Sequence, residues 1–338
     1  MSQQLFVDFA ASADYLGTGA IEVNQYEDVI LDIVRRTSVA LQRFRDVPAT
    51  GQPHRYFEQT AIGTAAFGST GGGNPNTGST SPISPTATGP TRVERPAFIK
   101  AITNQTNITL FDKMVTQQQK QFAQVVAQDV EDTLSAIQVT RAQALWNGND
   151  TSLSAPTTLQ YVGLLTQITQ QATCAPGVSI IDVLKAQVAA MVANPSFNVR
   201  PTAIYLNPVL NDYVDREAKA GNIILDQVEV AAGVTVSAIN TQAGKLPLIG
   251  EAFLPSATAA AYGFSAPPAG FKNYFAVIVT ERLIELPYVS GESQNPNPML
   301  FQLGLTGNLS GQYVGVKFDA VVAKGATYAH TVVCVQRP

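Results

Sequence analysis

Residues 111–150 read FDKMVTQQQKQFAQVVAQDVEDTLSAIQVTRAQALWNGND, and this stretch indicates the fold most clearly. Its apolar side chains recur mostly at steps of three, four or seven, with Gln and Asp between them, as on one face of an α-helix. They are Val115, Phe122, Val126, Val130, Leu134, Ile137 and Leu145. Asn147, Gly148 and Asn149 supply a helix-ending glycine and a turn. At about 1.5 Å per residue, the helix to Trp146 would be on the order of 50 Å long, more than a compact core requires.

The residues before this helix predict a long β-hairpin. RYFEQTAIGTAAFG (55–68) is strand-like, and TRVERPAFIKAITNQTNITL (91–110) is rich in β-branched residues with partial alternation. The run between them, 68–92, consists largely of Gly, Ser, Thr and Pro and carries no charge before Arg92. Isolated hairpins are marginal in water. This one is therefore expected to lie on another molecule or to be partly disordered.

The N-terminal residues predict an extended arm followed by a helix. Residues 1–23 hold scattered aromatic side chains without a sustained period. Asn24, with Glu27 three residues on, is a good N-cap. The apolar side chains that follow share one helical face: Tyr26, Ile30, Ile33, Val34, Leu41 and Phe44.

Helices and apolar strands alternate after the long helix. Ser179 and Asp182 mark the start of a helix that Pro195 closes. A second helix starts at Asn207-Pro208 and ends at Gly221. Strands are predicted at 202–207, 234–239, 274–280 and 282–289, and on both sides of a turn at 324–325.

Composition narrows the function classes. The 338 residues suffice for one large domain or two ordinary ones, 14% of them are charged, and the net charge is −4. No global basic field exists to attract nucleic acid, so tight nucleic-acid binding is disfavoured. Cys174 and Cys334 lie far apart in the sequence, which favours neither a disulfide framework nor a zinc site. We expect a soluble chain made inside the cell in a reducing compartment, because no membrane-spanning run or signal peptide is recognised.

No catalytic, cofactor-binding or metal-binding constellation is recognised, and we expect neither enzyme activity nor a cofactor. His330 is expected to be satisfied or exposed in an alternating strand, and His54 to lie in a surface loop. Gly263-Phe264-Ser265-Ala266-Pro267 lacks the second glycine of a nucleophile elbow. Gly244-Lys245 lacks the first glycine and the Ser or Thr of a phosphate-binding loop. Low charge and long extended excursions instead favour contacts with other chains, and self-assembly above all.

The order of these parts resembles the major capsid protein of tailed bacteriophages, which has the HK97-like fold. The sharpest local likeness is ALWNGNDTSLSAPTTLQYVGLL (144–165), similar to the family's spine-helix end, turn and Gly-Leu step into the axial domain. PTAIYLNPVLNDYV (201–214) and VIVTERLIELPYV (277–289) are similar to its strand-to-helix step and its late paired strands. The resemblance covers nearly the whole chain in order, and no single motif in it is diagnostic.

The resemblance implies an α+β fold in four parts. They are an N-terminal arm (1–23), an extended β-hairpin loop (48–108), an axial domain (159–289), and a peripheral domain with the spine helix (24–47, 109–158 and 290–338). It implies a structural protein that self-assembles as hexamers and pentamers into an icosahedral shell around double-stranded viral DNA. Such a virion protein would be assembled in the host bacterial cytoplasm. Implied partners are the chain itself, a separate scaffolding protein, a portal and, as a further candidate, a decoration protein, with weak non-specific DNA contact and no membrane.

Two features depart from some members of that family. Residues 51–99 contain no lysine and Lys100 lies at the hairpin stem, so the Lys-to-Asn cross-link of those members is not expected. The arm begins at Met1 with no coiled-coil region before it. Scaffolding is therefore expected from a separate protein, without extensive N-terminal processing.

Charged residues at the hairpin stem are the candidates for contacts between subunits. They are Arg55, Glu58, Arg92, Glu94 and Arg95. They are ionic groups on an otherwise neutral excursion and would fix its register on a neighbouring subunit. The alternative is that they are exposed strand charges that prevent edge pairing. Arg35 and Arg36 are candidates for facing packaged DNA, with solvated helix charges as the alternative.

Other interpretations remain open from the sequence. An encapsulin, a protein shell of the same fold that encloses an enzyme cargo, is the nearest. An α/β enzyme with an unrecognised site is a different class, supported by the alternation over 163–289. A phage tail or baseplate protein is a third alternative, which the long central helix disfavours.

Overall fold

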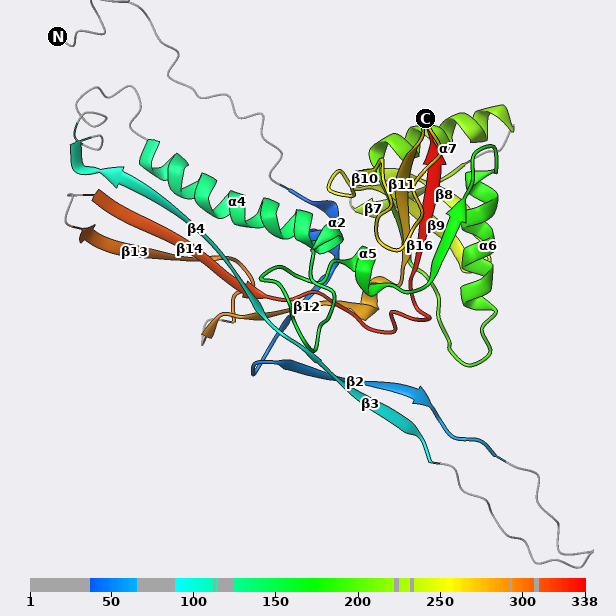
Figure 1. Cartoon of the computed structure of the whole chain (residues 1–338), viewed down its shortest axis with the longest axis horizontal. Coiled ribbons are helices and arrows are strands. Elements are labelled where there is room, and N and C mark those ends of the chain that lie inside the picture. Colours follow the sequence, from blue (N-terminus) through cyan, green and yellow to red (C-terminus); the bar gives the residue numbers. More distant parts are fainter. Residues whose placement is uncertain are drawn as a thin grey trace, which may run out of the picture.

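The computed structural model describes residues 37–65, 89–111, 114, 125–221, 225–231, 234–291, 294–306 and 310–338. Figure 1 shows three parts: a long helix lying on an extended sheet, an α/β body beside it, and a hairpin that projects away from both. The fold class is α+β, as predicted. No helix among these residues is both long enough and apolar enough to cross a membrane.

The long helix α4 (Val125–Asn147) lies along β4 (Lys100–Thr109) and β14 (Ser310–Asp319). Gly315 lets the helix approach closely, because a Cβ there would lie 2.8 Å from Ile137 Cδ1. Asn104 Nδ2 also donates to the carbonyl oxygen of Thr133 at 3.3 Å. The predicted helix and its end at the Asn-Gly-Asn turn are confirmed for residues 125–147, and 115–124 lie outside the described residues.

A six-stranded sheet carries this helix. β14 pairs antiparallel with β4, with β13 (Met299–Thr306) and with β12 (Ile284–Val289). β12 also pairs with β1 (Arg45–Pro48) in parallel and with β15 (Val322–Ala323) antiparallel. The short helix α2 (Val39–Arg43) precedes β1. Of the predicted N-terminal arm and helix, residues 1–36, which include Arg35 and Arg36, lie outside the described residues.

An eight-stranded sheet forms the α/β body. Its order is β5 (Gln171–Cys174), β16 (Thr331–Arg337), β11 (Lys272–Val279), β6 (Ala203–Leu206), β9 (Gly244–Gly250), β8 (Val234–Thr241) and β7 (Asp226–Ala231), with β10 (Ser256–Ala257) on β11. Helices α6 (Ile180–Val192) and α7 (Pro208–Ala220) pack on it in one hydrophobic core. A second core joins other side chains of this sheet to the end of α4 and to α5 (Leu164–Gln167).

Local helix signals are confirmed in the body. Ser179 caps α6 by accepting a hydrogen bond from the backbone N–H of Asp182. Asn207 caps α7 in the same way through Val209, with Pro208 in the first turn and Gly221 at its end. The strand predicted at 282–289 starts later, after a 3₁₀ turn η1 (Glu281–Leu283).

The two sheets divide the C-terminal part differently from the predicted ranges 159–289 and 290–338. β16 pairs with β11 and β5 inside the eight-stranded body sheet, whereas β12 pairs with β14 in the sheet under α4. β16 is buried at six of its seven positions because both faces of the strand are covered. Strands covered on both faces are near-continuously apolar, so the alternation predicted for the strand around His330 does not describe β16.

The predicted hairpin is confirmed as a separate two-stranded sheet of β2 (His54–Ala61) and β3 (Thr91–Ala97). It is shorter than 48–108, because β4 leaves it to pair with β14. The tip at 66–88 lies outside the described residues. Gln52 closes the root by accepting from and donating to the backbone of Ile99, at 2.9 and 3.1 Å.

Candidate assembly surface

The pairing register gives the hairpin two distinct faces. Tyr56 lies opposite Arg95 and Glu58 opposite Val93, so these side chains share one face with Ala97, here called the inner face. The outer face carries the residues of the other alternation: Arg55, Phe57, Gln59, Arg92 and Glu94. The two faces meet different surroundings, which separates the five predicted contact residues into two groups.

The inner face rests on the rest of the chain. Tyr56 and Ala97 are buried against Val322 and Leu153 in a small cluster separate from the two main cores. Lys324 Nζ lies 5.7 Å from the centre of the Tyr56 ring, a cation–π contact. Burial, together with the negative charge of nearby Glu58, raises the pKa of Tyr56 to about 12, so this ring stays neutral.

Glu58 and Arg95 belong to this inner face. The Glu58 carboxylate is buried and accepts from the backbone N–H of Gly325 at 2.7 Å. Its other oxygen accepts from Arg95 Nε at 2.6 Å. Both groups are therefore engaged within the chain, and any contact of theirs with a neighbouring subunit stays a prediction.

The outer face is open. Arg55 and Glu94 form an ion pair at 2.5 Å whose side chains are 62% and 40% exposed, and such exposed pairs contribute only about 0–1 kcal/mol to stability. Arg92 Nε donates to Gln59 Oε1 at 3.5 Å. Phe57 lies between these groups and is 69% exposed. Phe57 is not among the contact residues predicted from the sequence, although its position between Arg55 and Gln59 in an alternating strand is the signal that places it outward.

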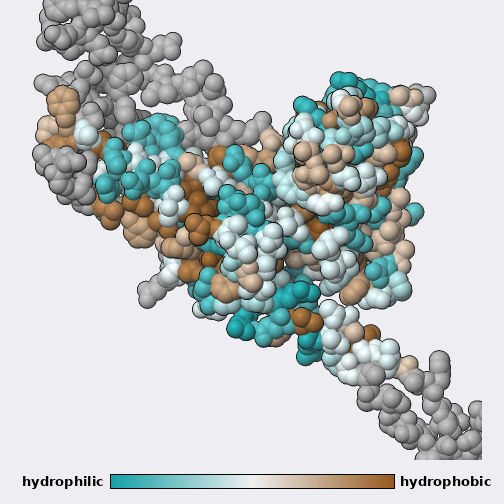
Figure 2. Space-filling model, viewed as in Figure 1, coloured by the Kyte–Doolittle hydropathy of each residue, from teal (hydrophilic) through white to brown (hydrophobic). Residues whose placement is uncertain are grey.

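A second open surface lies on the face of the six-stranded sheet turned away from α4. Gly315 faces the helix, so the residues of the other alternation in β14, and those opposite them in β13, point away from it. The apolar ones among them form a surface here called the apolar sheet face: Phe301, Leu303, Val314, Val316 and Phe318. Phe301, Leu303 and Phe318 are 49%, 47% and 37% exposed. Figure 2 shows brown, hydrophobic atoms along the sheet beside the teal surface of α4. Large contiguous apolar patches are rare on the surface of soluble monomers and mark interaction sites.

A buried charge cluster joins α4 to strands β14 and β1 of this sheet. Arg141 contacts Asp319 at 2.6 Å through Nε and Asp46 at 2.7 Å through a terminal nitrogen. Lys317 Nζ lies 3.8 Å from Asp319 and donates to the carbonyl oxygen of Pro296. Burial raises the pKa of Asp319 to about 7, and burial with the nearby Arg141 charge lowers that of Lys317 to about 7. This cluster was not predicted, since its members are far apart in the sequence.

The two histidines are held by contacts within the fold. His330 precedes β16 and is satisfied: its Nδ1 accepts from the Thr280 backbone at 3.3 Å, and Nε2 contacts the Lys324 carbonyl oxygen at 3.1 Å. Burial lowers its pKa to about 4. His54 opens β2 and stacks on Tyr56 at 6.4 Å, so it is not in a loop. Within the described part of the chain, no three His, Cys, Asp or Glu side chains gather as metal ligands would.

Comparison with solved structures identifies this architecture. A chain from Mycobacterium phage Bobi superposes with a TM-score of 0.59 at 13% identity, covering 98% of this chain and 99% of that one. The holo-SrpI encapsulin complex of Synechococcus elongatus gives 0.57 at 13% identity, covering 96% and 94%. The capsid of a native GTA particle gives 0.59 at 12% identity, covering 96% and 97%.

Sequence comparison gives no relative from which more could be inferred. No protein-family model matches the chain, and no curated protein matches its sequence. The similarity therefore lies in the arrangement of helices and strands over almost the whole length of the molecule. The chain has the HK97-like fold that the order of its parts predicts.

Proposed function

We propose that the chain is the major capsid protein of a tailed bacteriophage, a structural subunit and not an enzyme. It self-assembles as hexamers and pentamers into an icosahedral shell around double-stranded viral DNA. Assembly takes place in the host bacterial cytoplasm, and the product is the virion. Its partners are copies of itself, a separate scaffolding protein and a portal, with a decoration protein as a further candidate.

The observation that supports this proposal is the projecting hairpin with an open outer face (Figure 1). A two-stranded sheet is marginal when it stands alone, and Phe57 is 69% exposed at its centre. A neighbouring subunit that covered this face would bury Phe57 and pair with Arg55, Arg92 and Glu94. The apolar sheet face offers a second area of the kind that obligate interfaces bury.

Contact with DNA is proposed as weak and independent of sequence. The net charge of −4 gives no overall attraction to phosphates. Arg35 and Arg36, which lie outside the described residues, stay candidates for this contact. A shell that merely encloses DNA needs no more than this.

An encapsulin-type compartment is the second candidate, favoured by the similarity to the SrpI encapsulin complex. It shares the self-assembly and differs in its contents, protein cargo instead of DNA. The α/β enzyme alternative differs in size, since an enzyme of this length would form a small oligomer around a concave pocket.

Expression of the full chain, alone and with the products of neighbouring genes, tests the proposal. Gel filtration and negative-stain microscopy should show capsomers or closed particles. Nuclease-protected DNA inside particles supports the capsid, and protein cargo without DNA supports the encapsulin. A monomer or dimer under every condition, including with a candidate scaffolding protein, contradicts both.

A further inference from the structure

The hairpin is joined to the body of its own chain over a small area. Among the described strands, β2 and β3 pair only with each other, and their inner face touches the body through the cluster of Tyr56, Ala97, Val322 and Leu153. Of the side chains in these two strands, all of which are described, Glu58 is the one with a hydrogen bond to the body. The direction of the hairpin therefore depends on few contacts.

Glu58 links three segments with one carboxylate. One oxygen accepts from the Gly325 N–H at 2.7 Å and the other from Arg95 on the opposite strand at 2.6 Å. Gly325 has a φ of +69° and a Cβ there would lie 2.9 Å from the Tyr328 ring, so the turn that presents this N–H is narrowly fixed. Lys324 beside it is held by Glu285 at 2.7 Å. The acceptor on the hairpin thus meets a rigid donor on the body.

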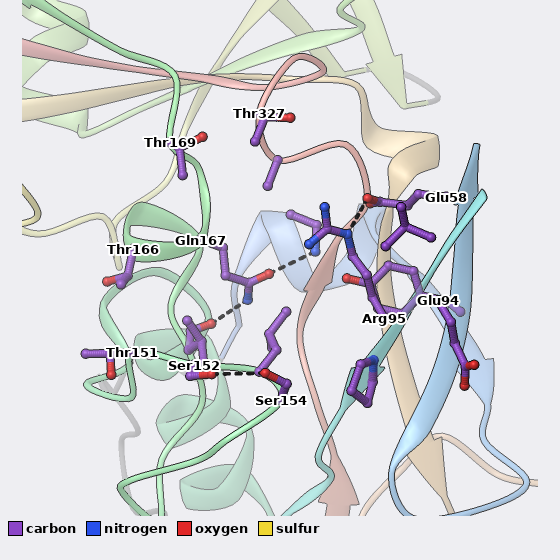
Figure 3. A pocket seen from close by; sticks show the side chains of 17 residues that line it. Glu58, Glu94, Arg95, Thr151, Ser152, Ser154, Thr166, Gln167, Thr169 and Thr327 are labelled. Atoms are coloured by element: carbon purple, nitrogen blue, oxygen red, sulfur yellow. Dashed lines mark hydrogen bonds and ion pairs between the residues drawn. The ribbon is translucent and has the colours of Figure 1, made fainter. Parts of the chain in front are cut away.

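The space next to this link is not filled. A hollow of about 480 Å³ lies beside the link, lined by the hairpin, the 151–154 loop and α5. Figure 3 shows Glu58 and Arg95 on one side of it and the hydroxyl groups of Thr151, Ser152, Ser154 and Thr166 on the other. Packed side chains on that side would have fixed the hairpin sterically. Their absence from the described wall leaves the angle to the Glu58 link, the small apolar cluster with the Lys324–Tyr56 contact, and the hydrogen bond from the Phe98 N–H to the Leu153 carbonyl oxygen at 3.2 Å.

Small rotations at this root are amplified along the strands. The eight residues of β2 extend about 26 Å at about 3.3 Å per residue. A rotation of about 10° would then displace the end of β2 by about 4 to 5 Å, roughly the spacing between two strands. A contact on a neighbouring subunit would be missed after such a displacement.

We propose that Glu58 is a positioning residue for assembly: its bonds to Gly325 and Arg95 set the angle at which the hairpin leaves the subunit. The effect on assembly rests on the proposed shell function, whereas the angle itself is a property of the isolated subunit. A buried carboxylate is costly to desolvate, and enforcing this geometry is the role that we assign to Glu58. The outer pair Arg55–Glu94 lacks this role, since it touches only the hairpin.

The direct test measures the hairpin angle in unassembled subunits. Spin labels on Phe57→Cys and Leu159→Cys occupy positions that are 69% and 91% exposed, while the native Cys174 and Cys334 are buried. Glu58→Ala should at least double the width of the 57–159 distance distribution, and Gly325 amide hydrogen exchange should quicken at least tenfold. Glu94→Ala, the matched control, should change neither. Equal distributions in the two variants would overturn the proposal.

Assembly gives the second readout. Glu58→Ala particles should vary in diameter or remain open, while Glu94→Ala particles match the wild type. If Glu58→Ala does not fold, Glu58→Gln keeps the side-chain shape and removes the charge that holds Arg95, and it should broaden the same distribution to a smaller extent. A wild-type chain that never assembles would refute the proposed function, whereas the label distances would still decide the role of Glu58.

Discussion

Gly148 and Gly163 lie backbone against backbone where the long helix ends. Gly163 N donates to Gly148 O at 3.3 Å, and a Cβ on Gly163 would lie 2.5 Å from both Gly148 N and Trp146 O. No side chain fits between these segments. The contact keeps Trp146 fully buried at the end of α4, with its ring 5.5 Å from that of Tyr205 on β6. This pair of glycines connects the helix to the α/β body.

Alanine at position 163 should therefore destabilise the subunit strongly. Backbone atoms cannot yield as a flexible side chain can, so we expect Gly163→Ala to lower the free energy of unfolding by about 3 kcal/mol, near the upper end for overpacking. Gly51→Ala is the control, since a Cβ there meets nothing within 4 Å. Urea denaturation compares the two, and equal midpoints would contradict the close contact.

Loss of Arg141 should be costly for an electrostatic reason. The side chains of Arg141 and Asp319 are 5% and 1% exposed, and Arg141→Ala would leave Asp319 buried with the more distant Lys317, at 3.8 Å, as its counter-charge. Breaking a buried pair in this way typically costs about 3–5 kcal/mol. Arg216→Ala removes an exposed pair with Asp212, at 69% and 56% exposure, and should cost less than about 0.5 kcal/mol. Chemical denaturation of both variants measures the difference, and a small loss for Arg141→Ala would show that the cluster does not anchor α4.

Acid should weaken the fold through His330. Burial lowers its pKa to about 4, below the value of about 6.5 in an unfolded chain, so the unfolded state binds the proton first. Its stabilising contribution is complete above pH 6.5 and is lost as the pH falls towards 4, with a loss of about 2 kcal/mol between pH 7 and pH 5.

The variant His330→Gln separates the pH dependence of stability due to His330 from that due to other groups. Asp319, whose pKa is raised to about 7, acts in the opposite direction, because its folded form retains the proton below pH 7. The comparison is therefore between wild type and His330→Gln, each unfolded at pH 7 and pH 5. The variant should lack about 2 kcal/mol of the acid-induced loss. Identical losses in both proteins would refute the assignment to His330.

Phe57 should affect assembly without affecting the subunit. Its ring is 69% exposed, so Phe57→Ser should leave the melting temperature of unassembled protein within about 2 °C. If the outer face lies on a neighbour, the loss of a buried aromatic side chain should raise the concentration needed for assembly at least tenfold, or about 1.4 kcal/mol. Light scattering over a concentration series measures this threshold. An unchanged threshold would remove the outer face from the interface.

Local signals account for what could be predicted from the sequence. The caps Ser179 and Asn207, the Gly148 turn and the hairpin strands depend on neighbours within a few residues, and the structure has them where they were expected. The resemblance to shell proteins rested on the order of such elements. The fold comparison confirms it over almost the whole chain.

The features that could not be predicted from the sequence depend on long-range contacts. Arg141 meets Asp46 and Asp319, and Glu58 meets Gly325, across separations that no local pattern encodes. The inner and outer faces of the hairpin differ through what the body covers, which a strand pattern alone does not show. The sheet that β16 joins could not be predicted for the same reason, since an apolar strand can pair in either sheet.

Cryo-electron microscopy of the assembled full-length protein tests the shell proposal most directly. The predicted result is a closed shell with five-fold and six-fold centres in which the outer face of each hairpin, with Phe57, lies on a neighbouring subunit. A small oligomer with the hairpin exposed, or a shell in which the hairpin touches only its own chain, would contradict it.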